Sequence, residues 1–218
     1  MYFEIGQPQR LSGVSLTCPD MQQLKKQISI AVVDDNPFLK ADALRTNGFN
    51  ITEVGDIRSI EQIMAFPIVI CDIKGVGKAF GSDYEGAHVL AEIRKAYPDK
   101  FLISFSGSQY DVSYNESLNS ADLSATKDAN LDYWIKVLET GLKAVGDPKE
   151  RWLRFRQTLT TKGVDSYEIF KLETAFVKSI SSKNTTAMSN YVVPDELKVI
   201  VKAFVSVALP QIIKSLMD

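Results

Sequence analysis

Five side chains that carry acid, hydroxyl or ammonium groups follow apolar runs at separate places in the sequence. Asp34 and Asp35 follow one run, Asp72 ends a second, Ser106 ends a third, and Lys127 comes last. If the runs are parallel strands of one sheet, these residues meet at its carboxyl edge, where open α/β sheets place their sites. Three carboxylates, a hydroxyl and a lysine around one point suit Mg²⁺ and a phosphoryl group.

The chemistry of such a group of side chains is specific. A carboxylate can accept a phosphoryl group and form an acyl phosphate. It must then lie near a divalent ion that offsets the charge on the phosphoryl oxygens. Because clustered acids repel one another without a cation, the cluster implies a metal, and Mg²⁺ prefers one or two carboxylates plus water and substrate oxygens. The hydroxyl and the ammonium can then bind two phosphoryl oxygens.

The elements that must position these residues alternate along the chain. Short apolar runs between helix-like segments predict a parallel sheet that is covered on both faces. The expected strands are Ile28–Val33, Asn50–Val54, Ile68–Cys71, Phe101–Phe105 and Asp122–Ala125. The expected helices are Pro37–Thr46, Ser59–Ala65, Gly86–Ala96, Asn115–Ser120 and Leu131–Val145.

The strand pattern stops after Gly146. Capping signals then predict three helices in residues 147–218, which begin after Asp147, Asp165 and Pro194. The last of them is apolar except for a narrow stripe of positions that recur every four residues. Such a helix needs more than one partner surface, so we expect a central bundle helix or a dimer interface. Residues 1–27 form an N-terminal extension.

Composition limits the classes of protein that remain. Hydrophobic residues make up 45% of the 218, enough for a core, so a folded chain is the default expectation. The net charge of −2 predicts no strong positive field of the kind that attracts nucleic acid. The charge is uneven, however: residues 1–147 carry 14 Lys/Arg and 20 Asp/Glu (−6), and residues 148–218 carry 11 Lys/Arg and 7 Asp/Glu (+4). Cys18 and Cys71 give no disulfide framework. The N-terminus shows no signal peptide and no segment predicts a membrane span, so we expect a cytoplasmic protein.

Four sequence motifs, in order and at expected strand ends, carry a family resemblance. VVDDN (Val32–Asn36), ICDIKG (Ile70–Gly75), SFSGS (Ser104–Ser108) and Lys127 resemble the response regulator receiver domain over about residues 28–146. The resemblance implies an α/β, flavodoxin-like, doubly wound sheet of five parallel strands in the order 2-1-3-4-5. An all-α C-terminal region, residues 147–218, would follow it as an output or oligomerisation region.

The resemblance also implies a role for each site residue. Asp34 and Asp35 would hold Mg²⁺, with Asp35 the more direct ligand. Asp72 would be both a metal ligand and the phosphoryl acceptor, and the backbone carbonyl of Lys74 would complete the metal shell. Two further residues would bind the phosphoryl group, namely Ser106 and Lys127.

These roles predict a phosphoprotein of two-component signalling. A histidine kinase or a phosphotransfer protein would supply the phosphoryl group, and the chain would not be an enzyme apart from slow self-dephosphorylation. Output would pass through residues 147–218 to a protein partner or a homodimer.

Departures from the family pattern keep other functions open. The loop Ile73–Glu85 is long, Ser124 stands where a switch aromatic is expected, and Asp128 replaces the usual proline after the lysine. These departures favour a pseudo-receiver, a binding or scaffold module that signals without phosphate. A phosphatase of the aspartyl-phosphate type would need a second acid two residues after Asp72, where Lys74 stands.

A nucleic-acid-binding regulator is a further alternative. Arg151, Arg154 and Arg156 alternate with apolar and aromatic residues in the first helix of the basic tail. We favour an apolar core with an exposed basic face for this helix.

Overall fold

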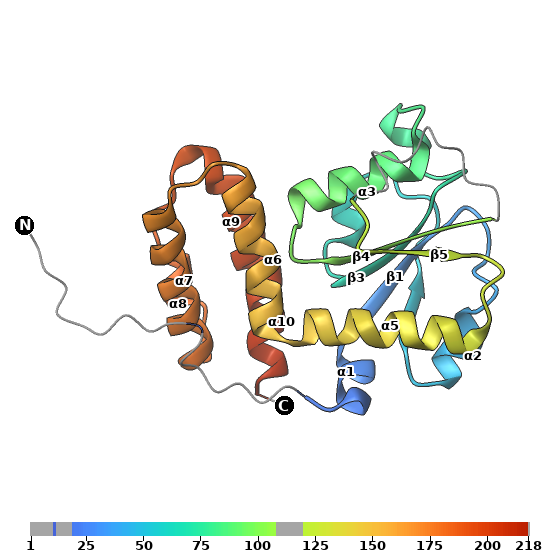
Figure 1. Ribbon diagram of the computed structural model, residues 1–218, viewed down its shortest axis with the longest axis horizontal. Helices are drawn as coiled ribbons and strands as arrows, with labels where there is room; N and C mark the ends of the chain where they lie inside the picture. Colours follow the sequence, from blue (N-terminus) through green and yellow to red (C-terminus); the bar gives the residue numbers. More distant parts are fainter. Residues whose placement is uncertain (1–10, 12–18, 108–119, 218) are drawn as a thin grey trace, which may run out of the picture.

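The computed structural model describes residue 11 and residues 19–107 and 120–217, which form an α/β unit and a helical unit (Figure 1). Cys18, Ser108 and most of the predicted helix Asn115–Ser120 lie outside the described residues.

The α/β unit is built on five parallel strands in the order β2-β1-β3-β4-β5, which confirms the predicted topology. Every residue of β3 and β4 is buried, as expected for strands that are covered on both faces. The strands differ from the predicted ones by one residue at most at either end: β1 is Ser29–Val33, β2 Asn50–Glu53, β3 Ile68–Asp72, β4 Phe101–Ser106 and β5 Leu123–Thr126.

Alternate strand residues point to opposite faces of the sheet, and helices cover both faces. Ile30 and Val32 belong to a core with α1 (Met21–Gln27), α2 (Ala41–Thr46) and α5 (Leu131–Gly146). Ala31 and Val33 belong to a second core with the 3₁₀ turn η2 (Ile60–Ile63) and α3 (Glu85–Ala96). Since Leu24 of α1 is buried in the first core, part of the N-terminal extension packs into the α/β unit.

Two predicted helices are shorter than expected. The first begins at Ala41 instead of Pro37, because the preceding residues form a turn in which the Phe38 amide donates to Glu53 Oε1. The predicted helix Ser59–Ala65 is only the turn η2. Gln62 Oε1 accepts from the amides of Arg58 and Ser59, which caps this turn, and Pro67 follows too closely for a longer helix.

The helical unit begins directly after α5. Its elements are α6 (Pro148–Thr161), α7 (Ser166–Ser181), α8 (Thr186–Ser189) and a continuous rod of η5 (Asp195–Leu197), α9 (Lys198–Ala203), η6 (Phe204–Ala208) and α10 (Leu209–Ser215). The three predicted helix starts are present, and α8 is additional. Four aromatic rings form the centre of this unit, with Trp152 stacked on Phe176 at 4.8 Å and Phe155 on Phe204 at 4.2 Å between ring centroids.

The last rod covers two surfaces of the same chain. Phe204, Leu209 and Ile212 are buried in the core of the helical unit, whereas Ala203 packs against the α/β core beside α3. The rod widens to a π turn, η6, just before Pro210, whose ring nitrogen has no hydrogen to donate. The rod is thus the central helix expected from its wide apolar surface. No helix in the described part of the chain has the length and apolarity that a bilayer crossing needs.

Ion pairs join the two units at the amino edge of the sheet. Arg151 of α6 pairs with Asp99, and both side chains are almost fully buried. Arg154 pairs with Asp122, which precedes β5, and Arg156 pairs with Glu173 within the helical unit at 3.6 Å. The apolar core expected for α6 is confirmed. The exposed basic face is present at Arg156, which is half exposed, and is wrong for Arg151, because its buried carboxylate partner is not revealed by sequence periodicity.

Candidate functional site: an acidic cluster at the carboxyl edge of the sheet

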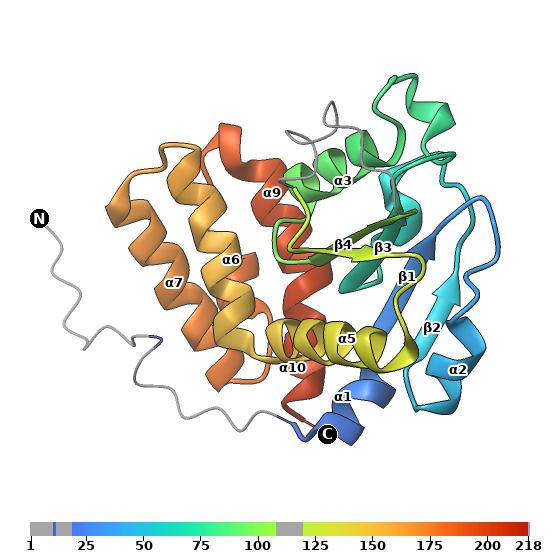
Figure 2. The same ribbon diagram turned by 45° about the vertical axis from the view of Figure 1, so that its right-hand side comes forward.

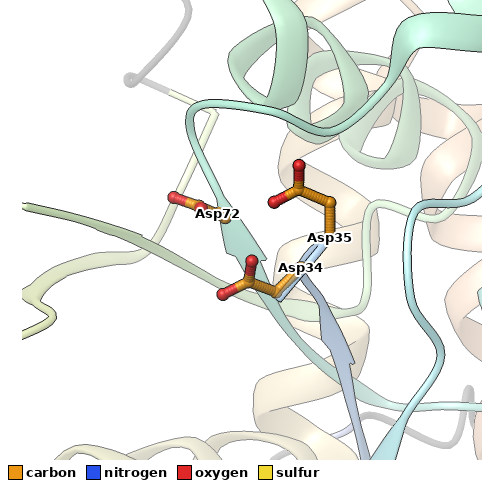
Figure 3. Close-up of side chains that lie close together, drawn as sticks. All are labelled: Asp34, Asp35 and Asp72. Carbon is orange, nitrogen blue, oxygen red and sulfur yellow. The ribbon is translucent and has the colours of Figure 1, made fainter. Parts of the chain in front are cut away.

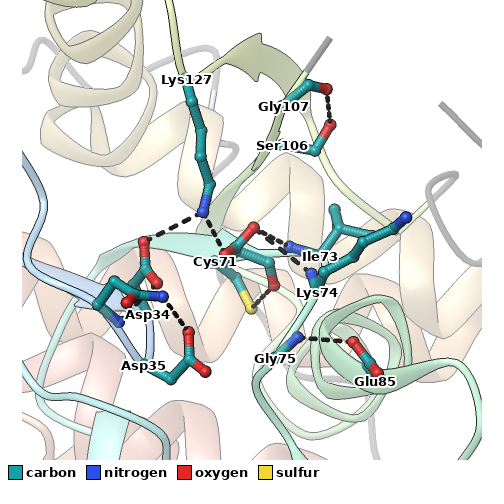
Figure 4. A network of polar contacts seen from close by, with 12 residues as sticks. Asp34, Asp35, Cys71, Ile73, Lys74, Gly75, Glu85, Ser106, Gly107 and Lys127 are labelled. Atoms are coloured by element: carbon teal, nitrogen blue, oxygen red, sulfur yellow. Dashed lines mark hydrogen bonds and ion pairs between the residues drawn. The ribbon is translucent and has the colours of Figure 1, made fainter. Parts of the chain in front are cut away.

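The strand ends bring most of the predicted site residues together. Asp34 and Asp35 follow β1, and Asp72 is the last residue of the neighbouring strand β3. Ser106 ends β4 and Lys127 follows β5. Asp34, Asp35, Asp72 and Lys127 form one cluster, while the Ser106 hydroxyl is directed elsewhere (Figures 3 and 4).

Three carboxylates face a common point. One oxygen each from Asp34, Asp35 and Asp72 lies within 4.8 Å of the others. Asp34 and Asp72 are buried, whereas the Asp35 side chain is 32% exposed. Asp35 is thus the member of the cluster that solvent reaches most easily.

Burial and mutual repulsion make the charge on this cluster costly. Desolvation raises the pKa of Asp34 above its ordinary value, and the nearby charge of Asp72 raises it further, while the Asn36 amide and Lys127 act in the opposite direction. Desolvation lowers the pKa of Lys127, but its hydrogen bond and charge interaction with Asp72, together with the charge of Asp34, raise it more. One ammonium therefore compensates only part of the negative charge of three carboxylates.

The carboxylate of Asp72 is held from two sides. Oδ1 accepts from the Ile73 amide at 2.8 Å, and Oδ2 accepts from Lys127 Nζ, which also lies 3.5 Å from Asp34 Oδ2 (Figure 4). Burial raises the pKa of the neighbouring Cys71 thiol, so this cysteine stays protonated in the core. These contacts fix the position of the Asp72 carboxylate.

Two predicted roles rest on groups that do not contact Asp72. The Ser106 hydroxyl donates to the Gly107 carbonyl at 3.1 Å, so it must rotate to reach a group on Asp72. The Lys74 amide lies 3.4 Å from Asp72 Oδ1, but the role of the Lys74 carbonyl in a metal shell stays a prediction.

Two carboxylates that the sequence did not single out hold the long loop after β3. Glu85 Oε2 accepts from the Gly75 amide, and Asp56 Oδ1 accepts from the Gly77 amide, both at 2.6 Å. Both glycines have positive φ, which suits this backbone path. The Gly-x-Gly spacing in the sequence is a signal for a tightly turned loop. The carboxylates that accept from these two glycines lie 10 and 21 residues away, so no local pattern predicts them.

The loop also brings a second lysine to the cluster. Lys78, at the start of the 3₁₀ turn η3 (Lys78–Phe80), lies 3.6 Å from Asp35 Oδ2. A Cβ on Gly75 would lie only 2.7 Å from the same oxygen, so the loop backbone passes directly against Asp35. Lys78 is largely exposed, and its ion pair is therefore weak.

We expect Lys78→Met to tighten Mg²⁺ binding by about 1.4- to fivefold, because the ion no longer competes with an ammonium whose ion pair contributes about 0.2–1 kcal/mol. Titration calorimetry with Mg²⁺ measures the effect. Lys136→Met, on the exposed side of α5, removes the same charge away from the cluster and serves as control. Equal affinities for the two variants would contradict a specific role for Lys78.

The residues of the cluster fit a magnesium ion. Carboxylate oxygens are the ligands that Mg²⁺ prefers, and oxygens of three carboxylates lie within 4.8 Å of one another here. Asp34, Asp35 and Asp72 would hold the ion, and the exposed side of Asp35 leaves room for water ligands.

Comparison with solved structures gives matches to the α/β unit. A CheY-like response regulator receiver domain protein from Methanospirillum hungatei JF-1 is 21% identical, with 53% of this chain and 94% of that chain covered and a TM-score of 0.43. The receiver domain of NtrX from Brucella abortus is 26% identical over 53% of this chain and 98% of that chain, with a TM-score of 0.45. The response regulator TrrA from Thermotoga maritima, in complex with Mg(2+)-BeF, is 24% identical over 52% and 97%, with a TM-score of 0.40.

Comparisons with protein-family models and with curated proteins give no match. The α/β unit has the strand order that the resemblance to receiver domains predicts. The solved structures similar to this chain are response regulator receiver domains that match about 53% of it, and the C-terminal helical region lies outside the match.

Proposed function

We propose that the α/β unit is the receiver of a response regulator and accepts a phosphoryl group on Asp72 in a Mg²⁺-dependent reaction. The observation that carries this proposal is the position of Asp72 at the end of β3, beside Asp34 and Asp35 and bonded to Lys127. An acidic cluster without a function needs no lysine bonded to its most buried carboxylate. A site for phosphoryl transfer needs both the clustered carboxylates and a lysine bonded to the acceptor.

The reaction follows from these contacts. An Asp72 oxygen attacks the phosphorus of a phosphohistidine on a histidine kinase or phosphotransfer protein, the new O–P bond forms, and the P–N bond to the imidazole breaks. A bound Mg²⁺ supplies positive charge that offsets the charge on the phosphoryl oxygens. Lys127 is close enough to move from Asp72 Oδ2 to a phosphoryl oxygen, and Ser106 reaches a second one after it leaves the Gly107 carbonyl.

Output through the helical unit is the second part of the proposal. Asp122 precedes β5, and its two carboxylate oxygens accept from Arg154 of α6, Arg94 of α3 and the Leu102 amide of β4. Lys127 follows the other end of the same strand. A shift of Lys127 on phosphorylation thus acts on a strand whose start is bonded to the helical unit, and the helical unit passes the change to a protein partner. We propose no catalytic turnover beyond slow self-dephosphorylation.

The pseudo-receiver alternative is favoured by one observation, the Lys78–Asp35 ion pair, which places a lysine ammonium beside one of the three carboxylates. The nucleic-acid alternative is not favoured, because Arg151 is buried with Asp99 and Arg154 is paired with Asp122, which leaves Arg156 as the exposed member of the three arginines.

Metal-dependent stabilisation tests the proposal. We expect Mg²⁺ at ten times its dissociation constant to raise the melting temperature by about 3–5 °C, since binding to the folded state adds RT ln(1 + [L]/Kd), or about 1.4 kcal/mol. Beryllofluoride, which mimics the phosphoryl group, should raise it further in the wild type and not in Asp72→Asn.

The controls are two aspartate variants. Asp35→Ala should lose the Mg²⁺ shift, whereas Asp83→Ala, at an exposed loop position, should keep it. A wild-type protein that responds to neither Mg²⁺ nor beryllofluoride would instead support the pseudo-receiver alternative.

A further inference from the structure

A cavity of about 480 Å³ lies where the two units meet. Its wall includes Ser29 and Asn50, the first residues of β1 and β2, so it opens at the amino edge of the sheet, at the opposite end of the strands from the acidic cluster. The remaining wall comes from the ends of α1 and α5, from α6 and α10, and from Ala65 and Pro67 in the segment before β3. Figures 1 and 2 show α10 near the ends of α1 and α5. Small-molecule sites often lie at such junctions, with volumes of about 300–1,000 Å³.

The charge around this cavity is of one sign. Lys26 of α1, Arg151 of α6 and Lys214 of α10 line it, and no carboxylate is among the described residues that do. Asp99 balances the charge of Arg151, which leaves the two lysines. The C-terminal ends of α1 and α5 contribute about half a negative charge each. A net positive charge remains that suits one small anion.

Arg151 gives the cavity a built polar wall. Its side chain is only 3% exposed, Nε and Nη2 donate to Asp99, and Nη2 also donates to Gln211 Oε1. Gln211 Nε2 in turn donates to the Ala65 carbonyl of the α/β unit at 2.9 Å. Nη1 of Arg151 has no hydrogen-bond partner among the described residues, so this fixed guanidinium retains a donor at a residue that lines the cavity.

Neutral groups complete the lining. Ser29, Asn50 and Ser215 can donate to an anion, while Ile28, Pro67 and Val145 offer apolar surface. The mixture of a few polar groups with apolar wall is typical of sites for small organic ligands.

We infer that this cavity binds a small oxyanion, a phosphate or carboxylate group alone or on a short carbon body. Lys26 and Lys214 supply the charge, and Nη1 of Arg151 supplies a hydrogen-bond donor. Because the lining comes from both units, the bound anion stabilises their docked arrangement. The site is independent of Asp72, so its failure would leave the proposed receiver function untouched.

Binding of inorganic phosphate to the metal-free full chain tests this inference, with calorimetry at constant ionic strength as the measurement. Glycerol 3-phosphate and succinate, used as parallel probes, distinguish free phosphate from a phosphate monoester and from a carboxylate. We expect saturable binding of at least one probe, with an affinity that falls about tenfold in the Lys26→Met/Lys214→Met double variant, a change equivalent to about 1.4 kcal/mol.

Two controls separate this site from general charge effects. Lys162→Met/Lys178→Met removes the same charge from exposed positions of the helical unit and should leave the affinity unchanged. Lys127→Met, at the acidic cluster, should also leave it unchanged. Amide chemical-shift changes at Asn50, Gln211 and Ser215 would locate the ligand directly.

Three results would overturn the inference. One is that none of the three probes binds. Another is an equal loss in the two double-lysine variants, which indicates screening by the whole surface. The third is loss of binding only in Lys127→Met, which places the anion at the acidic cluster.

Discussion

Arg151→Met is expected to lower the free energy of unfolding by about 3–5 kcal/mol, because removal of one partner from a buried ion pair leaves the other charge buried and uncompensated. Asp99 and Arg151 are 4% and 3% exposed, and Gln211 also loses the donor for its Oε1. Urea unfolding at neutral pH, followed by the fluorescence of Trp134 and Trp152, which lie one in each unit, measures the change.

The matched control is Arg156→Met on the same helix. Arg156 is 50% exposed and lies 3.6 Å from Glu173, so its loss should cost about 0–1 kcal/mol. Asp99→Leu combined with Arg151→Met should recover most of the stability, since a buried ion pair can be replaced by apolar side chains at little cost. Equal destabilisation by the two single variants would show that the Asp99–Arg151 pair does not hold the units together.

Among glycine-to-alanine substitutions in the α/β unit, Gly86→Ala is expected to cause the largest loss of folding stability. A Cβ on Gly86 would lie 1.8 Å from the Asp72 carbonyl oxygen and 2.9 Å from Val76 Cγ2. The start of α3 must therefore move away from the end of β3, which also breaks the bond from the Gly86 amide to the Ile73 carbonyl. We expect a loss of about 3 kcal/mol or more, at the upper end of overpacking effects, together with loss of the Mg²⁺ response.

Gly141→Ala is the control for this change. Gly141 also lies in a helix, α5, but the nearest atom to an added Cβ is Phe101 Cδ1 at 3.0 Å, on a side chain that can adjust. The gain in helix propensity of about 1 kcal/mol offsets the contact, so the net change should stay within about 1 kcal/mol. Similar melting temperatures of the two variants would mean that α3 can move away from the end of β3 without a loss of folding stability.

Local sequence patterns predicted the parts of the fold that depend on neighbouring residues. Apolar runs placed the five strands, and the polar residue at the end of each run placed Asp34, Asp35 and Asp72 at one edge, because parallel strands end on the same side. Capping signals located the starts of the three predicted helices in residues 147–218 in the same way. Helix lengths were less predictable, since the shortening around Phe38 depends on a bond to Glu53 fifteen residues away.

Contacts between distant residues were beyond the reach of such patterns. The helical pattern predicts that Arg151 is exposed on an amphipathic helix. Its partner Asp99 lies 52 residues earlier in the sequence, and the two side chains are buried together. Lys78 sits in a loop without periodicity, so its approach to Asp35 follows only from the path of the chain. The same holds for the hydrogen bond that Glu85, at the start of α3, accepts from the Gly75 amide. The last helix showed that it needs two partner surfaces, but not that both belong to its own chain.

Mass spectrometry after incubation with acetyl phosphate and Mg²⁺ tests most directly whether Asp72 accepts a phosphoryl group. We predict that the intact wild-type chain gains one phosphoryl group, that fragmentation locates it on Asp72, and that both chelation of Mg²⁺ and Asp72→Asn abolish it, while Asp83→Asn labels normally. Labelling of Asp72→Asn to the wild-type level, or a folded wild-type chain that takes up Mg²⁺ and remains unlabelled, would contradict the account.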